Sequence, residues 1–402
     1  MIDLPYTVFV ELPIYRNKQG QLFCDSLWAK DLRLHLTYIS HFSLCCPVIK
    51  DKIPQGYESI TQENIDDIGI KQVFELRYCV GFMSTFINFF PNFFTVWQAA
   101  KYSKIVHSAG SGWPFPSTFY LVFLWPFMHF KWVVNIESSF WMLSRSSKVT
   151  PRAWLSHHAH KILLGIALKM ADARIFTQTF YQQYFLGQDN SRSMINAASW
   201  VDAEKIISKE TLIQNQAQKN NTHLKLIFPT RLIADKGVHV LIEAVEHLKK
   251  MNTKVELTIM GSGDLQPLCK QTCTTVHPTV KLKFLEALPY DSIFFNTLQM
   301  YDLIVVANLK EEQPRNIFDA FSQGLGAIAS QTKGVQDITS SSNTVYFDVG
   351  NAEALANIIN ELSVNKAKVN ELGLAALTSM LQTTHANMHE TRRIFLEKTL
   401  AL

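Results

Sequence analysis

From about residue 223 onward, short apolar runs alternate regularly with amphipathic segments. Uninterrupted apolar runs are typical of parallel strands buried on both faces, and apolar residues at helical spacing indicate helices packed on such a sheet. The predicted strands are 223–229, 255–260, 280–285, 302–307 and 326–330. The predicted helices are 236–250, 290–299, 316–323 and 351–362, with one more after 261–263. This alternation predicts a doubly wound α/β sheet with right-handed crossovers.

The first half of the chain shows a less regular pattern of the same kind. Its predicted strands are 6–12, 45–49, 73–78, 104–109, 131–137 and 173–178, and its predicted helices are 26–40 and 157–171. Residues 208–222 are polar and have no packed face, so they predict a linker or an exposed loop. We therefore expect two α/β domains, 1–205 and 206–384, that face each other across a cleft lined by their strand ends.

Composition and charge narrow the function classes. A chain of 402 residues is too long for one ordinary core, and its 47% apolar and 18% charged residues are typical of a globular protein. Residues 1–200 hold 18 Lys+Arg against 13 Asp+Glu, whereas 201–402 hold 20 against 21. This imbalance is too weak for a nucleic-acid-binding protein. It fits light contact with an anionic membrane surface, but ordinary solvated charge is the simpler interpretation.

Three features bear on the cellular compartment. The six cysteines show neither a C-x-x-C pair nor the spacing of a disulfide framework, so we expect free thiols. The amino terminus lacks the basic and apolar regions of a signal peptide. The apolar stretch 119–130 contains Pro126 and His129 and is shorter than the ~20 residues that span a bilayer. It predicts a buried helix, with an interfacial helix as the alternative, in a cytoplasmic protein that is at most peripheral on the inner membrane face.

Charged residues follow two of the predicted strands in the second half. The strand 302–307 leads into Glu311, Glu312 and Arg315, and the strand 223–229 leads into Arg231 and Lys236. In open α/β sheets, ligands bind at the carboxyl ends of the strands, where helix amino termini favour anions. Two cations at such an edge indicate a site for a phosphate group, although a salt-bridged surface loop is the alternative.

The order of these motifs resembles that of family-4 glycosyltransferases, which have the GT-B fold of two Rossmann-like domains. The resemblance rests on Arg-x4-Lys-Gly, a Gly-x-Gly at Gly261 and Gly263, and Glu-x7-acid-Ala-x-x-x-Gly, and it covers about residues 223–363. It implies that 206–384 binds a nucleotide-diphosphate sugar and 1–205 the acceptor, a glycan, lipid-linked or small molecule. It also implies sugar transfer with retention, no metal or other cofactor, and a helix at 385–402 that crosses back to the first domain.

The resemblance assigns roles to residues of the second domain. Arg231 and Lys236 match the pair that binds the donor diphosphate, and Glu311 matches the glutamate beside the transferred sugar. Asp319 stands where the family has a second glutamate for the ribose hydroxyls. Pro314 and its neighbours replace a glycine-rich segment, so we expect the side chains of Arg315 and Asn316 to supply contacts to the donor instead. For Gly261 and Gly263, a tight turn explains the glycines equally well.

Candidates in the first domain are less specific. Glu137 ends a strand where many relatives carry a histidine, and it could take the acceptor proton or cap a helix. Lys18 and Gly20 could reach a phosphate or lie in an exposed turn. His107 and Trp113 are expected to line the cleft, although aromatic residues there suit core packing too.

A metal site is the less favoured interpretation of three nearby histidines. His157, His158 and His160 lie on a predicted helix without a close cysteine or acid, and we expect them on a solvated face. The sequence thus predicts a nucleotide-sugar-dependent glycosyltransferase of polysaccharide or glycoconjugate biosynthesis. A GT-B sugar-nucleotide epimerase and a non-catalytic sugar-nucleotide-binding relative are the alternatives.

Overall fold

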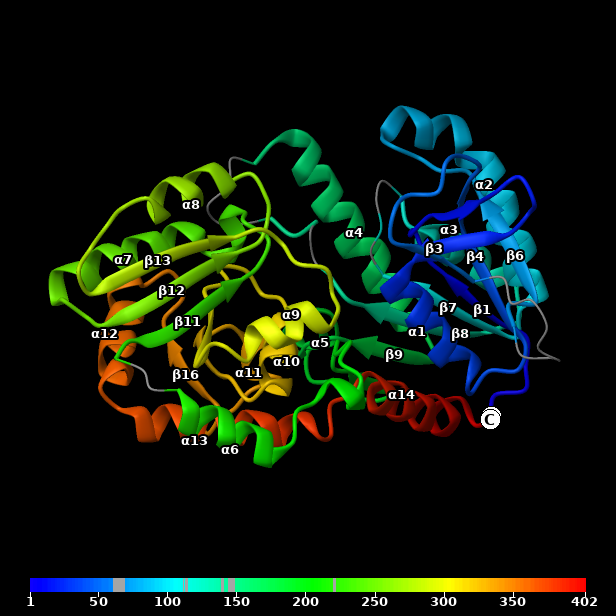
Figure 1. The fold of residues 1–402 in the computed structure, drawn as a ribbon. Helices are drawn as coiled ribbons and strands as arrows, with labels where there is room; N and C mark the ends of the chain where they lie inside the picture. The colour runs from blue at the N-terminus through cyan, green and yellow to red at the C-terminus, as the bar shows by residue number, and fades with distance from the viewer. Residues whose placement is uncertain (61–68, 111, 113–114, 139–140, 144–148, 220–221) are drawn as a thin grey trace. The chain divides into compact units, whose positions relative to one another are not determined.

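The computed structural model describes residues 1–60, 69–110, 112, 115–138, 141–143, 149–219 and 222–402. The chain forms two compact units (Figure 1). Unit 1 comprises Met1–Asn196 together with His389–Leu402, and unit 2 comprises Ala197–Met388. The chain therefore passes between units after residues 196 and 388, whereas the sequence pattern predicted boundaries at 205 and 384.

Unit 1 is built on a parallel sheet in the order β10-β9-β8-β7-β1-β4, with β6 paired to β4. Its strands are β1 (Tyr6–Phe9), β4 (Phe42–Ile49), β6 (Gln72–Leu76), β7 (Ile105–Ala109), β8 (Lys131–Ile136), β9 (Ala173–Phe176) and β10 (Ser193–Ile195). Beyond β4 the sheet continues through three short strands, β2 (Ile14–Arg16), β3 (Leu22–Asp25) and β5 (Tyr57–Ser59). The central strands are buried, as their uninterrupted apolar runs predict.

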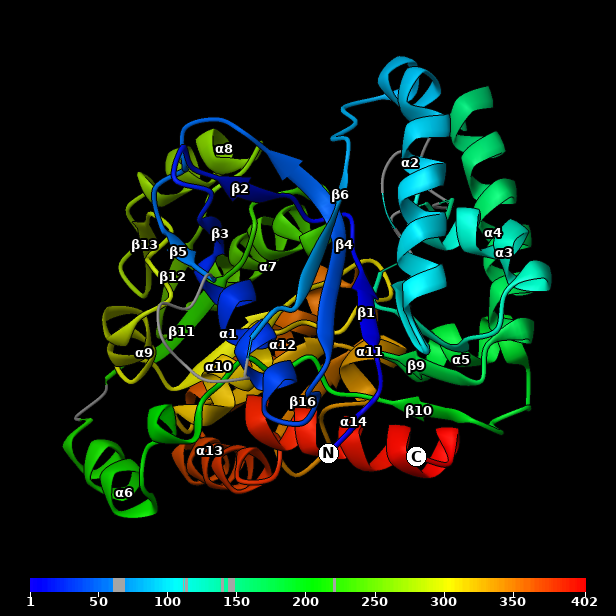
Figure 2. The ribbon, with the colours of Figure 1, turned by 90° about the vertical axis from the view of Figure 1, so that its right-hand side faces the viewer.

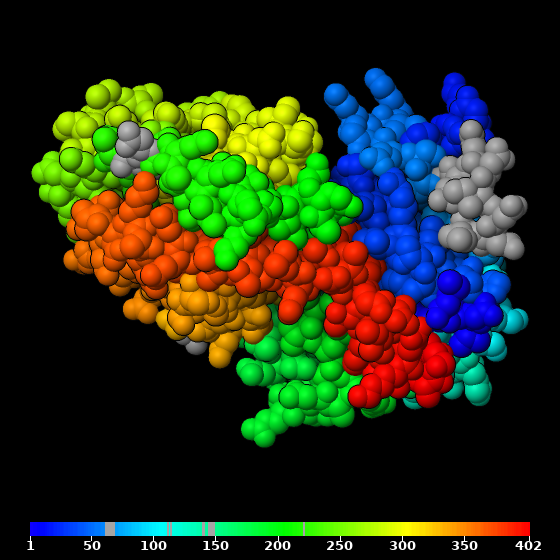
Figure 3. Space-filling view, turned by 60° about the horizontal axis from the view of Figure 1, so that its bottom comes forward, coloured from blue at the N-terminus to red at the C-terminus, as the bar shows by residue number. Residues whose placement is uncertain are grey.

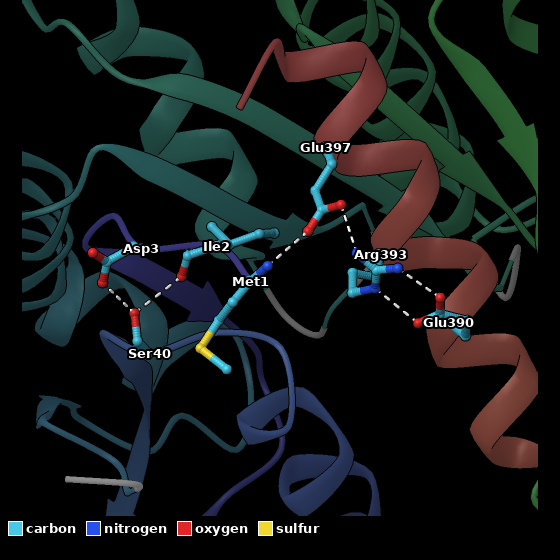
Figure 4. A network of polar contacts seen from close by, with 7 residues as sticks. All are labelled: Met1, Ile2, Asp3, Ser40, Glu390, Arg393 and Glu397. Carbon is cyan, nitrogen blue, oxygen red and sulfur yellow. Dashed lines mark hydrogen bonds and ion pairs between the residues drawn. The ribbon is translucent and has the colours of Figure 1, made fainter.

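Among the described residues, six α-helices belong to or reach unit 1. They are α1 (Ser26–Leu36), α2 (Phe82–Tyr102), α3 (Ser117–Leu124), α4 (Pro151–Met170), α5 (Thr179–Leu186) and α14 (His385–Leu400). Helix α14 packs Leu396 and Leu400 into the same core as Ile2 and Trp28. In Figure 3 its red atoms lie against the blue atoms of the N-terminal residues. The amino group of Met1 donates to Glu397 at 3.1 Å, and Arg393 binds Glu397 and Glu390 (Figure 4).

Unit 2 has a six-stranded parallel sheet in the order β13-β12-β11-β14-β15-β16. The strands are β11 (Leu224–Pro229), β12 (Val255–Met260), β13 (Val280–Leu285), β14 (Leu303–Val306), β15 (Gly326–Ser330) and β16 (Thr344–Phe347). The helices are α6 (Lys209–Gln218), α7 (Val238–Met251), α8 (Gln266–Cys273), α9 (Ser292–Leu298), α10 (Asn316–Ser322), α11 (Lys333–Gln336), α12 (Ala352–Ser363) and α13 (Lys366–Met380). Two apolar clusters cover the sheet, one containing residues of α7 and α12 and the other residues of α9, α10 and α13. The predicted α/β architecture of two doubly wound sheets is confirmed.

Several segments differ from or refine the sequence predictions, and β16, α13 and α5 were not predicted. The predicted linker 208–222 is wrong for most of its length, because α6 is a helix of unit 2 whose Leu212 is buried. The pattern missed α2 altogether. The apolar stretch 119–130 forms the end of buried α3 and a 3₁₀ turn, with Phe123 and Phe127 exposed.

Candidate functional site

The candidate site of unit 2 lies where the strand order reverses. The chain builds β11, β12 and β13 outward in one direction and then returns to place β14 on the other side of β11. The loops after β11 and β14 therefore leave the sheet from neighbouring strands in opposite directions, which opens a ligand-binding crevice in this class of fold. These two loops carry Arg231, Lys236, Glu311 and Arg315.

Several contacts hold the two loops together. The backbone N–H of Leu309 donates to the carbonyl of Asp235 at 2.9 Å, and the ammonium of Lys310 lies 2.7 Å from the Asp235 carboxylate. The side-chain amide of Asn316 donates to the carbonyl of Pro229, the last residue of β11, at 2.8 Å. Asn316 thus fixes the start of α10 to the end of the neighbouring strand.

The two proposed phosphate ligands have different surroundings. The ammonium of Lys236 is largely buried and forms an ion pair with Glu312. The side chain of Arg231 is exposed at the end of β11, and its guanidinium makes no hydrogen bond or ion pair with any residue that the structure describes. A free guanidinium beside a lysine is suited to a phosphate group, because both charges can bind its oxygens.

Gly261 and Gly263 form a turn that packs against the loop after β11. Their φ angles are +145° and +149°, and a Cβ atom on Gly261 would lie 1.9 Å from the carbonyl oxygen of Thr230. Leu232 donates to the carbonyl of Ser262 at 2.8 Å, so the two loops are joined by backbone hydrogen bonds. The tight-turn explanation therefore accounts for both glycines without a ligand.

Glu311 contacts the beginning of a different helix from the one that follows it. Its carboxylate accepts a hydrogen bond at 3.3 Å from the backbone N–H of Gly334, in the first turn of α11. Burial raises the pKa of the Glu311 carboxyl above its ordinary value, while the Gly334 and Lys333 amides oppose the shift. The side chain is half-buried, so it is held in place and still reaches the surface.

The side chain of Asp319 is less accessible to solvent than those of Arg231 and Arg315. It is buried on α10, and its carboxylate accepts a 2.7 Å hydrogen bond from the hydroxyl of Tyr290. Burial, followed by the nearby carboxylate, raises the pKa of the Tyr290 hydroxyl. Arg315, which precedes α10, is exposed, and its guanidinium lies 5.3 Å from the ring centre of Trp200.

In unit 1, Glu137 and His107 occupy different environments. Glu137 is exposed directly after β8 and accepts a 2.7 Å hydrogen bond from the side-chain amide of Asn135. His107 is buried on β7, and its Nδ1 lies 2.9 Å from the Tyr6 hydroxyl. Burial lowers the pKa of the His107 imidazole, with Arg392 and His35 adding to the shift. The structure therefore encloses His107 in the core of unit 1.

Among the remaining acceptor-side candidates, the structure describes Lys18 and Gly20. Lys18 and Gly20 are exposed in the turn between β2 and β3, where Gly20 has a φ of +84° and no neighbour within 4 Å of a Cβ position. Both residues therefore lie in an exposed turn, which the sequence analysis gave as the alternative to a phosphate contact. Trp113 lies outside the described residues.

Sequence reasoning missed Glu11, which follows β1 where the strand order of unit 1 reverses between β1 and β7. Its carboxylate accepts hydrogen bonds from the backbone N–H and the hydroxyl of Ser117, at 2.6 and 2.8 Å. Burial raises the pKa of the Glu11 carboxyl. It lines a cavity of about 30 Å³ with Arg77, Cys79 and Tyr120, which has room for little more than a water molecule. Its position at a strand end is the sequence signal that could have identified it.

The histidines of α4 pack against aromatic residues. His160 is buried and stacks on Trp141, so the prediction of a solvated face is wrong for this residue. Among the described residues, one group has the geometry of a metal site, namely Asp31, His35 and His389. His389 Nε2 lies 2.9 Å from the Asp31 carboxylate, and the Arg392 guanidinium lies 3.1 Å from His35. This group joins α14 to α1, and the adjacent guanidinium disfavours a metal cation.

Comparisons with known proteins agree with this architecture. Residues 209–377 match the family described as glycosyl transferases group 1. The amylovoran biosynthesis glycosyltransferase AmsK of Erwinia amylovora is 28% identical over 173 residues, which is 41% of this chain and 42% of that protein. The match thus spans less than half the length of this curated relative.

Two solved structures resemble the whole chain at 14% identity. Alr3699/HepE of Anabaena in complex with UDP has a TM-score of 0.67, with 99% of this chain and 100% of that one covered. Sucrose-phosphate synthase of Thermosynechococcus elongatus has a TM-score of 0.71, with both chains fully covered. At this identity the likeness shows the fold. The chain has the GT-B fold, and residues 209–377 of its second unit match the glycosyl transferases group 1 family.

Proposed function

We propose that the protein is a glycosyltransferase that uses a nucleotide-diphosphate sugar as donor. The observation that carries this proposal is the pair of loops after β11 and β14, which bring Arg231, Lys236 and Glu311 to the point where the strand order of unit 2 reverses. Cations at this edge match a diphosphate, and the site lies within the segment that matches glycosyl transferases group 1.

In this proposal, the side chains act at three parts of the donor: the diphosphate, the ribose and the sugar. Arg231 and Lys236 bind the diphosphate and stabilise the charge that develops on it as the sugar leaves, without a metal ion. Asp319 binds the ribose hydroxyls, after the Tyr290 hydroxyl has given up its hydrogen bond. The carboxylate of Glu311 lies beside the sugar and stabilises positive charge at the anomeric carbon. Arg315 and Asn316 complete the donor site, and the reaction retains the anomeric configuration.

For the acceptor, we propose only a class of molecule and one candidate residue. Unit 1 binds a glycan or lipid-linked acceptor, and Glu137 is its candidate acid or base because it is exposed at a strand end. We place the protein in the cytoplasm, in polysaccharide or glycoconjugate biosynthesis. The relatives support the biosynthetic role and the nucleotide-sugar donor, since AmsK is an amylovoran biosynthesis glycosyltransferase and Alr3699/HepE was solved with UDP.

Calorimetric titration with nucleoside diphosphates, followed by incubation with radiolabelled nucleotide sugars, tests the proposal. We expect binding of at least one nucleoside diphosphate and slow release of labelled sugar to water or to an added acceptor. Conversion of the donor to an epimer would instead identify a sugar-nucleotide epimerase. Binding without turnover of any donor, in the presence of membrane and glycan extracts, would identify a non-catalytic relative.

A further inference from the structure

Helix α2 presents an apolar face to solvent. Five large side chains at helical spacing on this face are more than half exposed: Met83 (74%), Phe86 (81%), Ile87 (66%), Phe90 (69%) and Phe94 (57%). A water-soluble surface helix normally turns its apolar side chains toward the core and its polar ones outward. A contiguous apolar stripe of this length is typical of an interaction surface. We call these five residues the α2 stripe.

The opposite face of α2 already packs against unit 1. Phe89 and Phe93 contact Tyr120 of α3, and Val96 and Ala99 lie in the core. The side-chain amide of Asn92 on this inner face hydrogen-bonds to the backbone of Arg77 at both its N–H and its carbonyl. The fold of unit 1 therefore uses the inner face of α2 and leaves the stripe without a role in the core.

Helix α4 carries further exposed apolar side chains. The guanidinium of Arg152 lies over the ring of Phe82, 4.6 Å from its centre, so a side chain from the first turn of α4 contacts one from the first turn of α2 (Figure 2). On α4, Trp154, Leu155 and Ile162 are exposed. Exposed apolar residues thus occur on both of these helices of unit 1.

The charged residues on and near α2 and α4 are almost all basic. Neither α2 nor α4 contains an acidic residue. Exposed Arg77, Lys101 and Arg152 lie at or near the helix ends, and exposed Lys161 lies in the middle of α4. From 76 to 171 the sequence holds one acid, Glu137. The cations of that segment are Arg77, Lys101, Lys104, Lys131, Arg145, Lys148, Arg152, Lys161 and Lys169. An apolar stripe flanked by cations is complementary to the surface of an anionic lipid bilayer.

We infer that the α2 stripe docks onto an anionic lipid bilayer, with α2 lying in the plane of the interface. Among the described residues, no helix is both long and apolar enough to cross a membrane, so α2 lies on the bilayer surface. Exposed Trp97 and Trp154 suit the headgroup region, where amphipathic rings accumulate. A second copy fits less well, because a symmetric contact of this face with itself would bring cations together without acids.

This inference is independent of the proposed donor chemistry, because it rests on residues of unit 1 alone. Its test therefore measures binding to lipid rather than turnover. The full chain is sedimented with vesicles of phosphatidylcholine, or of equal parts phosphatidylcholine and phosphatidylglycerol. We expect binding to the anionic vesicles and much weaker binding to the neutral ones. Raising the salt from about 0.1 M to about 1 M shortens the screening length from about 10 Å to about 3 Å and should weaken the binding.

Matched double variants assign the binding to the stripe. Phe86→Ser with Phe90→Ser should lower partitioning onto anionic vesicles about tenfold or more, because two aromatic rings no longer enter the interface. Val364→Ser with Leu381→Ser, which removes two exposed apolar side chains from unit 2, should leave it unchanged. Circular dichroism and thermal melting establish that both variants are folded.

Three outcomes would overturn the inference. They are absence of binding to anionic vesicles, equal binding by the two double variants, and equal binding of the wild type to neutral and anionic vesicles. Sedimentation velocity without lipid tests whether the stripe instead binds a second copy of the chain. A wild-type dimer that the Phe86→Ser/Phe90→Ser variant dissociates, with no vesicle binding, would assign the stripe to a second copy of the chain.

Discussion

At the level of single residues, the two cations of the candidate phosphate site differ in their partners. Lys236 forms an ion pair with Glu312, whereas the Arg231 guanidinium is unpaired among the described residues. We expect Arg231→Ala and Lys236→Ala each to weaken nucleoside-diphosphate binding by about 2 kcal/mol or more, the scale of a lost charge-assisted contact. Calorimetry measures this, with Lys368→Ala on α13 as the control. Unchanged affinity in both variants would remove the basis of the donor site.

The adjacent carboxylates Glu311 and Glu312 should respond differently to loss of charge. Glu311→Gln keeps an oxygen for the Gly334 amide, so the protein should fold and bind nucleoside diphosphate nearly as well as the wild type. Its turnover should fall roughly a hundredfold or more, because the variant lacks the charge that stabilises the transition state. An equal loss of turnover in Glu312→Gln, or unfolding of Glu311→Gln, would favour a helix-capping role for Glu311.

Glu312→Gln should instead act on binding. This variant removes the counterion of Lys236 and a negative charge close to the proposed diphosphate. We therefore expect its affinity for nucleoside diphosphate to equal or exceed that of the wild type. A loss of affinity comparable to that of Lys236→Ala would mean that the ion pair positions the lysine rather than competing with the ligand.

Asp319→Asn should mainly weaken nucleotide binding. The proposed partner of Asp319 is the ribose, which is present in the ground state and the transition state alike. Asparagine keeps an oxygen for the Tyr290 hydroxyl but loses the charge, and Tyr290→Phe tests whether that hydrogen bond matters by itself. Calorimetry and saturation kinetics separate the two effects. Full affinity together with abolished turnover would contradict the ribose-binding role.

At the level of elements, α6 has a single buried side chain, which the sequence pattern did not reveal. Leu212 is buried, and a Cβ atom on Gly324 would lie 2.5 Å from its side chain, so the helix packs against the glycine that ends α10. Leu212→Ala should lower the free energy of unfolding of unit 2 by about 2–3 kcal/mol, and Ile213→Ala, at an exposed neighbour, should change it little. Urea unfolding measures both, and equal effects would mean that α6 is peripheral to the unit.

The elements that sequence could predict are those with a regular apolar pattern. Strands β11 to β15 and helices α7 and α12 have one apolar face or continuous burial, and they lie within a few residues of their predicted positions, whereas β16 was not predicted. Helix α6 has one buried residue in ten, which leaves no periodic signal. Helix α2 is apolar on both faces and contains Pro91, so neither periodicity nor propensity pointed to it.

The position of the candidate site could be predicted from sequence, but its side-chain contacts could not. Strand ends can be located from sequence, so Arg231, Lys236 and Glu311 were assigned to one sheet edge. Which partner each side chain takes depends on contacts between distant segments. The pairing of Lys236 with Glu312, of Glu311 with Gly334 and of Asp319 with Tyr290 could not be obtained from spacing.

At the level of the whole molecule, the chain leaves unit 1 after residue 196 and returns to it at residue 389. The returning helix α14 is joined to α1 by His389, which lies 2.9 Å from the Asp31 carboxylate and 3.3 Å from the Tyr38 hydroxyl, and by Arg392 beside His35. These groups are largely buried, so the folded state of unit 1 depends on their protonation.

This network predicts that unit 1 becomes less stable as the pH falls. Burial lowers the pKa of the His389 imidazole to about 3, against an ordinary value near 6.5, so the folded state holds this histidine neutral while the unfolded state takes up a proton. The contribution of His389 to the free energy of unfolding is therefore complete above about pH 6.5. Between about pH 6.5 and about pH 3 it falls by on the order of 1 kcal/mol per pH unit. The lowered pKa of His107 acts in the same direction.

Tryptophan fluorescence can follow this loss in unit 1, because every tryptophan of the chain except Trp200 lies within residues 1–196. Urea unfolding between pH 7 and pH 4 should show a midpoint that falls with pH, and His389→Gln should show a shallower fall. Glutamine retains an amide donor for Asp31 but takes up no proton on unfolding, so the variant keeps the contact and loses one titrating group. The same pH dependence in both proteins would exclude His389 as its source and would transfer the effect to His107 or to groups outside the α14 contact.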